Sequence, residues 1–124
     1  MNTRLVDKLF KIASPMCQAM SRRKKHCSVI LYKGKVLSIG TNVFKTHPMA
    51  KMKGYKFEER HSELDAYLKI KTPQSGMILV NMRFNKDGEL RMSRPCGHCL
   101  PWCLKSFDEI WYTTNDGLVL LINN

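Results

Sequence analysis

The part of the chain that says most about the fold is a pair of fragments, His61-Ser62-Glu63 and Pro95-Cys96-Gly97-His98-Cys99. An imidazole and two thiolates are ligands that zinc prefers, and a catalytic zinc keeps one coordination position open for water. The pair therefore predicts a fold that brings His61, Cys96 and Cys99 around one catalytic Zn²⁺ ion. Glu63 then supplies a carboxylate that can exchange protons beside the metal.

Each fragment is expected at the beginning of a helix. Cys96 and Cys99 are three residues apart, so they share one face of a helix predicted over residues 95–107, with both in its first turn. The partial positive charge of a helix N-terminus helps to stabilise thiolates. His61 and Glu63 can reach one space from the first turn of a helix predicted over about 58–71. Pro101 costs a backbone hydrogen bond, so the later helix is either kinked or regular only after the cysteines.

The remaining sequence predicts a mixed α/β domain. Apolar residues at helical spacing predict a helix over residues 3–21, with Pro15 as a kink or break. Short apolar runs predict strands at 27–31, 36–39, 77–84, 110–114 and 118–122. Lys33-Gly34-Lys35 is the expected hairpin turn between the first two strands. Asn115-Asp116-Gly117 is a tight-turn signal, so the last two strands are expected to run antiparallel.

Length and composition indicate one domain spanning residues 1–124. Apolar residues make up 44% and charged residues 25% of the chain, which is ordinary for a soluble globular protein. The five cysteines include a C-x-x-C pair, which predicts metal binding in a reducing compartment rather than a disulfide framework. The first ten residues lack the apolar core of a signal peptide, and the longest apolar run, Leu118 to Ile122, is too short to span a bilayer. We therefore expect a cytoplasmic protein that does not enter a membrane.

The charge balance favours an anionic partner. The net charge is +11, and residues 22–60 hold eleven Lys and Arg against only Glu58 and Glu59. Loops of this kind can hold the phosphate of a nucleotide or follow the backbone of single-stranded nucleic acid. The alternative is a basic surface that serves only solubility.

The two fragments match the H-x-E…P-C-x-x-C pattern of zinc-dependent nucleobase deaminases. From about Cys27 to Ile122 the chain resembles the cytidine and deoxycytidylate deaminase superfamily. The resemblance implies a three-layer α/β/α cytidine-deaminase-like fold, with a mixed five-stranded sheet whose last two strands are antiparallel. It implies hydrolytic deamination of cytosine to uracil, with Glu63 as the catalytic acid and base. Asn42 resembles an asparagine that holds the substrate sugar, with a turn residue as the alternative. Arg94 directly precedes Pro95 and is expected to meet a phosphate or a flanking nucleotide, with a surface arginine as the alternative.

Three functions remain open. The first is deamination of a cytosine nucleotide such as deoxycytidylate. The second is deamination of cytosine, with adenine as a weaker alternative, in single-stranded DNA or RNA. The third is a non-catalytic, zinc-stabilised nucleic-acid-binding module, in which a fourth protein ligand closes the metal site; the candidates are His26, His47, His98 and Cys103. The Glu63 carboxylate argues against this third function.

The remaining predictions concern three other cysteines and the oligomeric state. Cys17, Cys27 and Cys103 are predicted to be buried thiols of the core. A second zinc ion at His26 and Cys27 is an alternative with less specific spacing. Association into a homo-oligomer is expected by analogy with the superfamily.

Overall fold

The structure, a computed structural model, describes residues 1–19, 26–42 and 61–123. Its elements are α1 (Thr3–Ala19), β1 (His26–Tyr32), β2 (Lys35–Thr41), α3 (Ser62–Leu68), β3 (Ile78–Arg83), α4 (Leu100–Ser106), β4 (Glu109–Thr114) and β5 (Gly117–Asn123). The strands form one sheet in the order β2-β1-β3-β4-β5. β3 and β4 are parallel, and the other neighbouring strands are antiparallel. The predicted mixed five-stranded sheet with an antiparallel end is confirmed.

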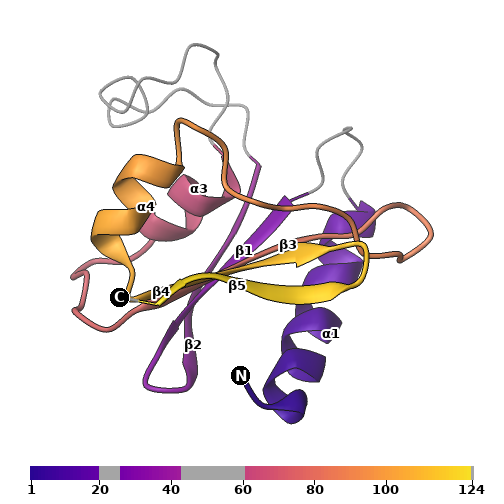
Figure 1. The fold of residues 1–124 in the computed structure, drawn as a ribbon, viewed down its shortest axis with the longest axis horizontal. Coiled ribbons are helices and arrows are strands. Elements are labelled where there is room, and N and C mark those ends of the chain that lie inside the picture. The colour runs from indigo at the N-terminus through magenta and orange to yellow at the C-terminus, as the bar shows by residue number, and fades with distance from the viewer. Residues whose placement is uncertain (20–25, 43–60, 124) are drawn as a thin grey trace.

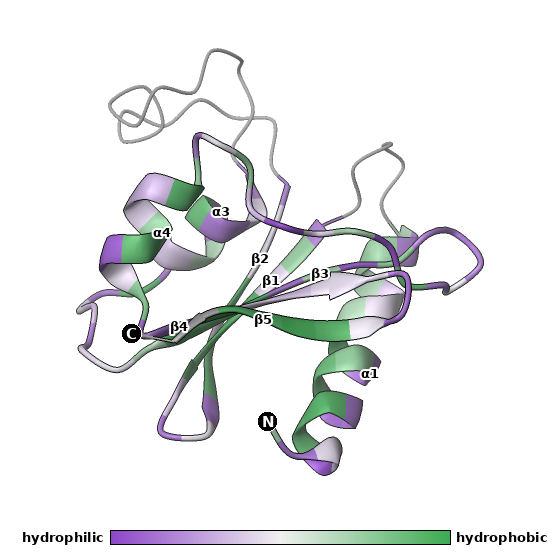
Figure 2. Cartoon of the chain, viewed as in Figure 1, coloured by the Kyte–Doolittle hydropathy of each residue, from purple (hydrophilic) through white to green (hydrophobic). Residues whose placement is uncertain are grey.

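The helices cover both faces of the sheet, so the expected three layers are present. α1 lies on one face, and α3 and α4 lie on the other (Figure 1). Alternation along the strands supplies a core to each side. In β3, Leu79 belongs to the cluster under α3 and α4, whereas Val80 belongs to the cluster under α1. Hydrophobic residues accordingly run through the central strands, while α1 alternates between hydrophobic and hydrophilic residues (Figure 2).

α1 does not break at Pro15, so that part of the prediction is wrong. The helix continues through Pro15 to Ala19 and buries Leu9, Ala13 and Cys17. Pro15 lies on the exposed side of the helix. The carbonyl that loses its intrahelical donor there is that of Lys11, which is also exposed, so water can replace the missing hydrogen bond. Residues 20 and 21 of the predicted helix lie outside the described residues.

The first hairpin turns tightly at two residues. Lys33 has φ 51° and Gly34 has φ 77°, and both values are left-handed. Two successive left-handed residues are typical of the type I′ turn, whose twist matches that of paired strands. Lys35 is therefore already the first residue of β2.

α4 begins only after Cys96 and Cys99, so of the two alternatives for Pro101 the helix that is regular only after the cysteines is confirmed. Cys99 is the N-cap residue and Pro101 lies in the first helical positions, where a missing N–H costs nothing. The expectation that both cysteines lie in the first turn of a helix is therefore wrong. Residues 97–99 form a turn ahead of the helix. The other helix, α3, ends at Leu68, three residues earlier than predicted, and the predicted residues 58–60 lie outside the described part of the chain.

Close contact with β2 places α3, and with it His61 and Glu63. A Cβ atom on Gly40 would lie only 2.3 Å from the backbone nitrogen of Ala66 and 2.4 Å from the carbonyl oxygen of Ser62. Only glycine therefore lets the helix approach β2 this closely. The Ser38 hydroxyl donates to the Ala66 carbonyl at 2.7 Å, which ties the same two elements together.

Candidate metal centre

The side chains of His61, Cys96 and Cys99 come together near the N-terminal ends of α3 and α4, two helices on the same face of the sheet. Cys96 Sγ and Cys99 Sγ each lie 3.5 Å from His61 Nδ1. The three ligand atoms all lie within 4.8 Å of one another, close enough to bind one metal ion. With the usual Zn–N and Zn–S bond lengths, a tetrahedral site has an N···S edge of about 3.6 Å. The spacing of this donor set therefore fits zinc.

The electrostatics of the cluster favour a thiolate at Cys96. A hydrogen bond with the Cys99 side chain is the main reason that the pKa of Cys96 is lowered from 9.0 to about 3. Burial opposes this shift, while the His61 side chain and the backbone N–H groups of Cys99 and His98 add to it. Metals bind thiolate rather than thiol. The turn before α4 therefore prepares Cys96 as a ligand, although the residue is not inside the helix.

Glu63 lies beside this group and is almost completely buried, with 1% of its surface exposed. Its Oε1 accepts a hydrogen bond from the Ser62 hydroxyl at 2.8 Å. Glu63 is not part of the group of atoms that could ligate the metal, but it lines a cavity with His61 and Cys96. The cavity has a volume of about 40 Å³, more than a single water needs. The carboxylate is thus placed next to the metal-binding group without belonging to it.

The structure brings the predicted substrate contacts to the same cavity. Both Asn42 and Arg94 line it together with Glu63. Arg94 is exposed, so its charge lies at the surface end of the site. That the two residues contact a substrate remains a prediction.

Two further residues line this cavity, namely His26 and Asn81. His26 was considered only as an alternative metal ligand, and sequence reasoning missed Asn81 altogether. The sequence did contain a signal, because Asn81 is an amide in the middle of the apolar run that forms β3. A polar side chain inside a buried strand needs hydrogen-bond partners, which often belong to a site.

Within residues 1–19, 26–42 and 61–123, no fourth side chain completes a closed metal site. The one group of three or more candidate ligands there does not include His26, His98 or Cys103. Cys103 is buried in the core cluster under α4, as expected. Cys17 and Cys27 are buried in the other cluster, and burial is the main cause that raises the pKa of Cys27 to about 12. Such a thiol keeps its proton and is a poor zinc ligand, which disfavours a second zinc at Cys27. His47 lies outside the described residues.

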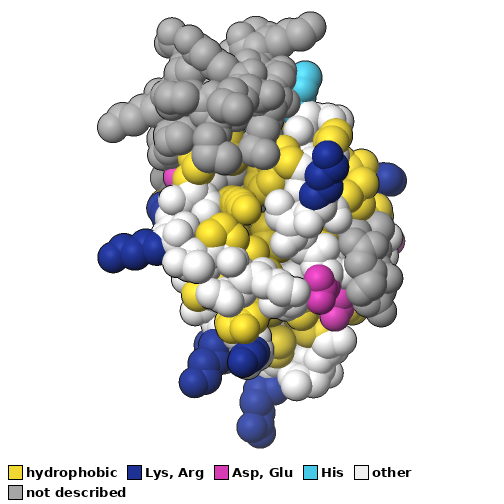
Figure 3. Space-filling model, turned by 90° about the vertical axis from the view of Figure 1, so that its left-hand side faces the viewer, with side chains coloured by type: hydrophobic (Ala, Val, Ile, Leu, Met, Phe, Trp, Pro, Cys, Tyr) yellow, Lys and Arg dark blue, Asp and Glu magenta, His cyan; other side chains and the backbone are white. Residues whose placement is uncertain are grey.

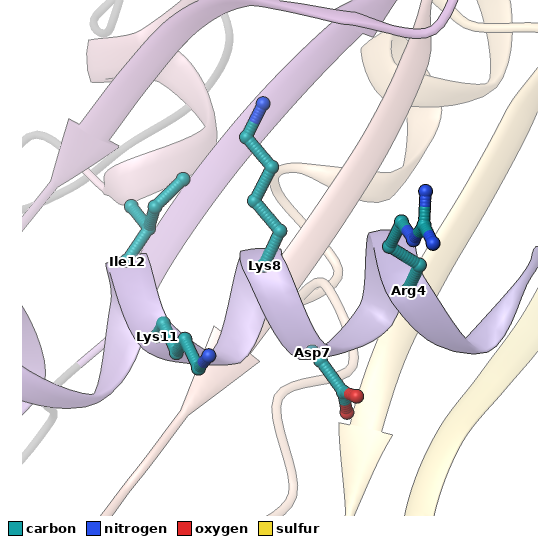
Figure 4. A pocket seen from close by; sticks show the side chains of 5 residues that line it. All are labelled: Arg4, Asp7, Lys8, Lys11 and Ile12. Atoms are coloured by element: carbon teal, nitrogen blue, oxygen red, sulfur yellow. The ribbon is translucent and has the colours of Figure 1, made fainter.

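A larger hollow, of about 630 Å³, runs along α1 and contains none of the predicted site residues. Arg4 and Lys8 extend to the same side of the helix there, and Asp7 points away from them (Figure 4). Lys11 and Ile12 complete its lining. A single helix supplies all five residues, so we assign the chemistry to the small cavity at Glu63, where several elements meet.

Most of the strongly basic stretch, at residues 22–25 and 43–60, lies outside the described residues, so its predicted role is untested. Among described residues, Lys and Arg are spread around the face shown in Figure 3, and acidic side chains appear in few places. No helix in the described part of the chain is both long and apolar enough to cross a membrane.

The order of the strands and the placement of the helices define a cytidine-deaminase-like α/β fold. No protein-family model matches the sequence, and no curated protein does. Among solved structures, the dCMP deaminase of the cyanophage S-TIM5 in its apo form is similar, with a TM-score of 0.64 and 20% identity over 90% of this chain and 84% of that one. The same enzyme in complex with dCMP and dUMP gives a TM-score of 0.62 and 19% identity over 90% and 82%. At this level of identity the likeness establishes the fold.

Proposed function

We propose that the chain is a zinc-dependent hydrolase that deaminates cytosine to uracil, with a nucleotide such as deoxycytidylate as its substrate. The observation that carries the proposal is the position of Glu63. Its buried carboxylate lines the same cavity as His61 and Cys96 but stands outside the group of candidate ligands. A carboxylate that ligated the metal could not also carry protons.

His61, Cys96 and Cys99 would hold one catalytic zinc ion. Among the described residues this donor set has three protein ligands, which is the number that a catalytic zinc site uses. Zinc bound there would supply the Lewis acidity that lowers the pKa of water towards neutrality.

Glu63 would then move the protons. Its carboxylate takes the proton that the attacking water gives up and delivers it to N3 of the cytosine ring. Attack at C4 and a second transfer through Glu63 release the amino group as ammonia and leave uracil. The Ser62 hydroxyl can serve both states of Glu63, since it donates to the ionised carboxylate and can accept from the protonated one.

The substrate side of the proposal rests on the residues around the cavity and on the fold. Asn42 would contact the sugar, and Arg94 at the exposed rim would contact the phosphate. The structural neighbour is a dCMP deaminase that was solved with dCMP and dUMP, which are related by this reaction. The net charge of +11 keeps a second candidate in view, namely deamination of cytosine within single-stranded nucleic acid.

The experiment is a substrate panel. Zinc-loaded protein is incubated with dCMP, deoxycytidine, single-stranded DNA and RNA, and uracil products and ammonia are measured. We expect stoichiometric uracil and ammonia from dCMP, with little from deoxycytidine because it lacks the phosphate. Conversion only within a polymer would select the second candidate, and no product from any substrate would refute a deaminase.

A further inference from the structure

A chain of buried polar side chains runs from Glu63 through the sheet to β4. Each member is at most 1% exposed, and the members are Ser28, Ser62, Glu63, Asn81, Ser93 and Thr113. Burial of polar groups costs free energy unless they are hydrogen-bonded to one another. Because apolar side chains could fill the same space without this cost, we looked for a function of the network in the neighbouring site.

Asn81 is the junction of this network. Its Oδ1 accepts a short hydrogen bond from Ser28 Oγ and lies 3.3 Å from Ser62 Oγ, whose single proton is donated to Glu63. Its Nδ2 donates to the Ser93 carbonyl at 2.6 Å. Only the oxygen can accept from hydroxyls and only the nitrogen can donate to a carbonyl, so these partners fix the orientation of the amide.

One side of the junction leads to the proton carrier. Ser28 and Asn81 are directly paired on β1 and β3, beneath the beginning of α3. Ser28 Oγ lies 2.7 Å from Ser62 Oγ, and the Ser62 hydroxyl donates to Glu63 Oε1 at 2.8 Å. Asn81 thereby contacts the pair of hydroxyls that orients the Glu63 carboxylate.

The other side of the junction leads to the metal ligands. Ser93 Oγ donates to the backbone carbonyl of Asn81 at 2.7 Å, in return for the bond from Nδ2. Ser93 Oγ also accepts a hydrogen bond from the Thr113 backbone N–H at 2.7 Å, which anchors it to β4. Arg94 and Cys96 follow within three residues and lie outside regular helix and strand. Backbone hydrogen bonds from Ser93 N to the Thr113 carbonyl and from Leu100 N to the Cys96 carbonyl hold the two ends of this segment, and the Ser93 and Asn81 side chains add to them.

We propose that Asn81 is the positioning residue that holds Glu63 and the Cys96 segment in register across the candidate metal centre. The proposal rests on the proposed function for its catalytic consequence, but its effect on metal binding is independent of turnover. The side-chain amide of Asn81 thus connects two segments, Ser62–Glu63 and Ser93–Cys96, which both contribute to the candidate metal centre. Groups that orient metal ligands commonly change metal affinity by about 10–100-fold when they are removed.

The test uses Asn81→Leu, which keeps the branch at Cγ and removes the hydrogen-bonding amide. Zinc affinity is measured for the whole chain by competition with a chromophoric chelator, and kcat and KM are measured with dCMP. We expect zinc affinity to fall at least tenfold, and kcat to fall about 10–100-fold because Glu63 is misplaced. Ser106→Ala is the control, because it removes a side-chain-to-carbonyl hydrogen bond, to Trp102, at the C-terminal end of α4, and it should change zinc affinity less than threefold.

A double-mutant cycle with Ser62→Ala separates positioning from general destabilisation. If Asn81 acts through Ser62, the two losses in kcat do not multiply, whereas independent losses would contradict that link. Ser93→Ala is the milder variant should Asn81→Leu fail to fold, with an expected threefold to tenfold loss of zinc affinity. Unchanged zinc affinity in the variant tested would overturn the inference. If zinc affinity depends on Asn81 but the parent chain turns over no cytosine substrate, the proposed function is refuted and the positioning role of Asn81 is retained.

Discussion

The contact between α3 and β2 at Gly40 gives the sharpest prediction about how the fold builds the site. In Gly40→Ala, the new methyl carbon would lie 2.3 Å from the Ala66 nitrogen and 2.4 Å from the Ser62 oxygen. Ordinary contacts begin about 1 Å further out, so α3 must retreat by about that distance. Overpacking costs about 1–3 kcal/mol, and the cost is at the upper end here because both obstructing atoms are backbone.

Movement of α3 away from β2 in Gly40→Ala would also stretch two hydrogen bonds that join these elements. Ser38 Oγ donates to the Ala66 carbonyl, and the Thr41 N–H donates to Asp65 Oδ2 at 3.0 Å. With about 1 kcal/mol for each bond, the expected total loss is about 3–5 kcal/mol. That loss corresponds to a fall of about 10–20 °C in Tm.

Urea denaturation of the chelated protein, followed by circular dichroism, measures this loss in the free energy of unfolding. Gly97→Ala is the control, since a methyl group there meets nothing within 4 Å. The control should stay within about 1 kcal/mol of the parent chain. A Gly40→Ala chain that is also within about 1 kcal/mol would refute the tight contact between α3 and β2.

The remaining predictions concern the metal ligands. In chelated protein, iodoacetamide should label Cys96 at a rate that hardly changes between about pH 5 and 8, because a pKa lowered to about 3 keeps the thiolate fully formed across that range. An ordinary thiol would slow about tenfold for each pH unit below its pKa, and such a slope at Cys96, measured by mass spectrometry, would contradict the hydrogen bonding at this turn. Cys27, whose pKa is raised to about 12 by burial, should remain unlabelled until the chain unfolds. His61→Ala should lose zinc by elemental analysis and also lose the stabilisation that zinc gives to the parent chain, which is about 2.7 kcal/mol at a hundredfold excess over Kd; an undiminished zinc content would remove His61 from the ligand set.

The sequence predicted the features that depend on local pattern. The apolar run over residues 77–84 and the turn signal at Asn115-Asp116-Gly117 are local, and both elements formed close to the expected bounds. Ligand types and their spacing are local as well, which is why His61, Cys96 and Cys99 could be brought together in advance.

The features that could not be predicted from the sequence depend on contacts between segments that are distant along the chain. Periodicity placed Cys96 in a helix, but α4 begins at Leu100, where Pro101 fits the first turn. Pro15 predicted a kink or break in α1; the helix does not break there, because its opposite side packs against the sheet. Asn81 has a role only because β1, α3 and the segment before α4 meet at its side chain, and no spacing in the sequence shows that meeting.

A comparison of Glu63→Gln with the parent chain at equal zinc content isolates the proposed role of the Glu63 carboxylate. Formation of dUMP from dCMP is followed together with zinc content by elemental analysis. In the proposed mechanism Glu63 carries the protons and does not hold the metal. We therefore expect one bound zinc in both proteins and a loss of at least a thousandfold in kcat for the variant, in the upper part of the about 10²–10⁴-fold range for general acid–base catalysis. A variant that binds zinc and turns over dCMP like the parent chain would contradict the account, and so would a parent chain that forms no dUMP.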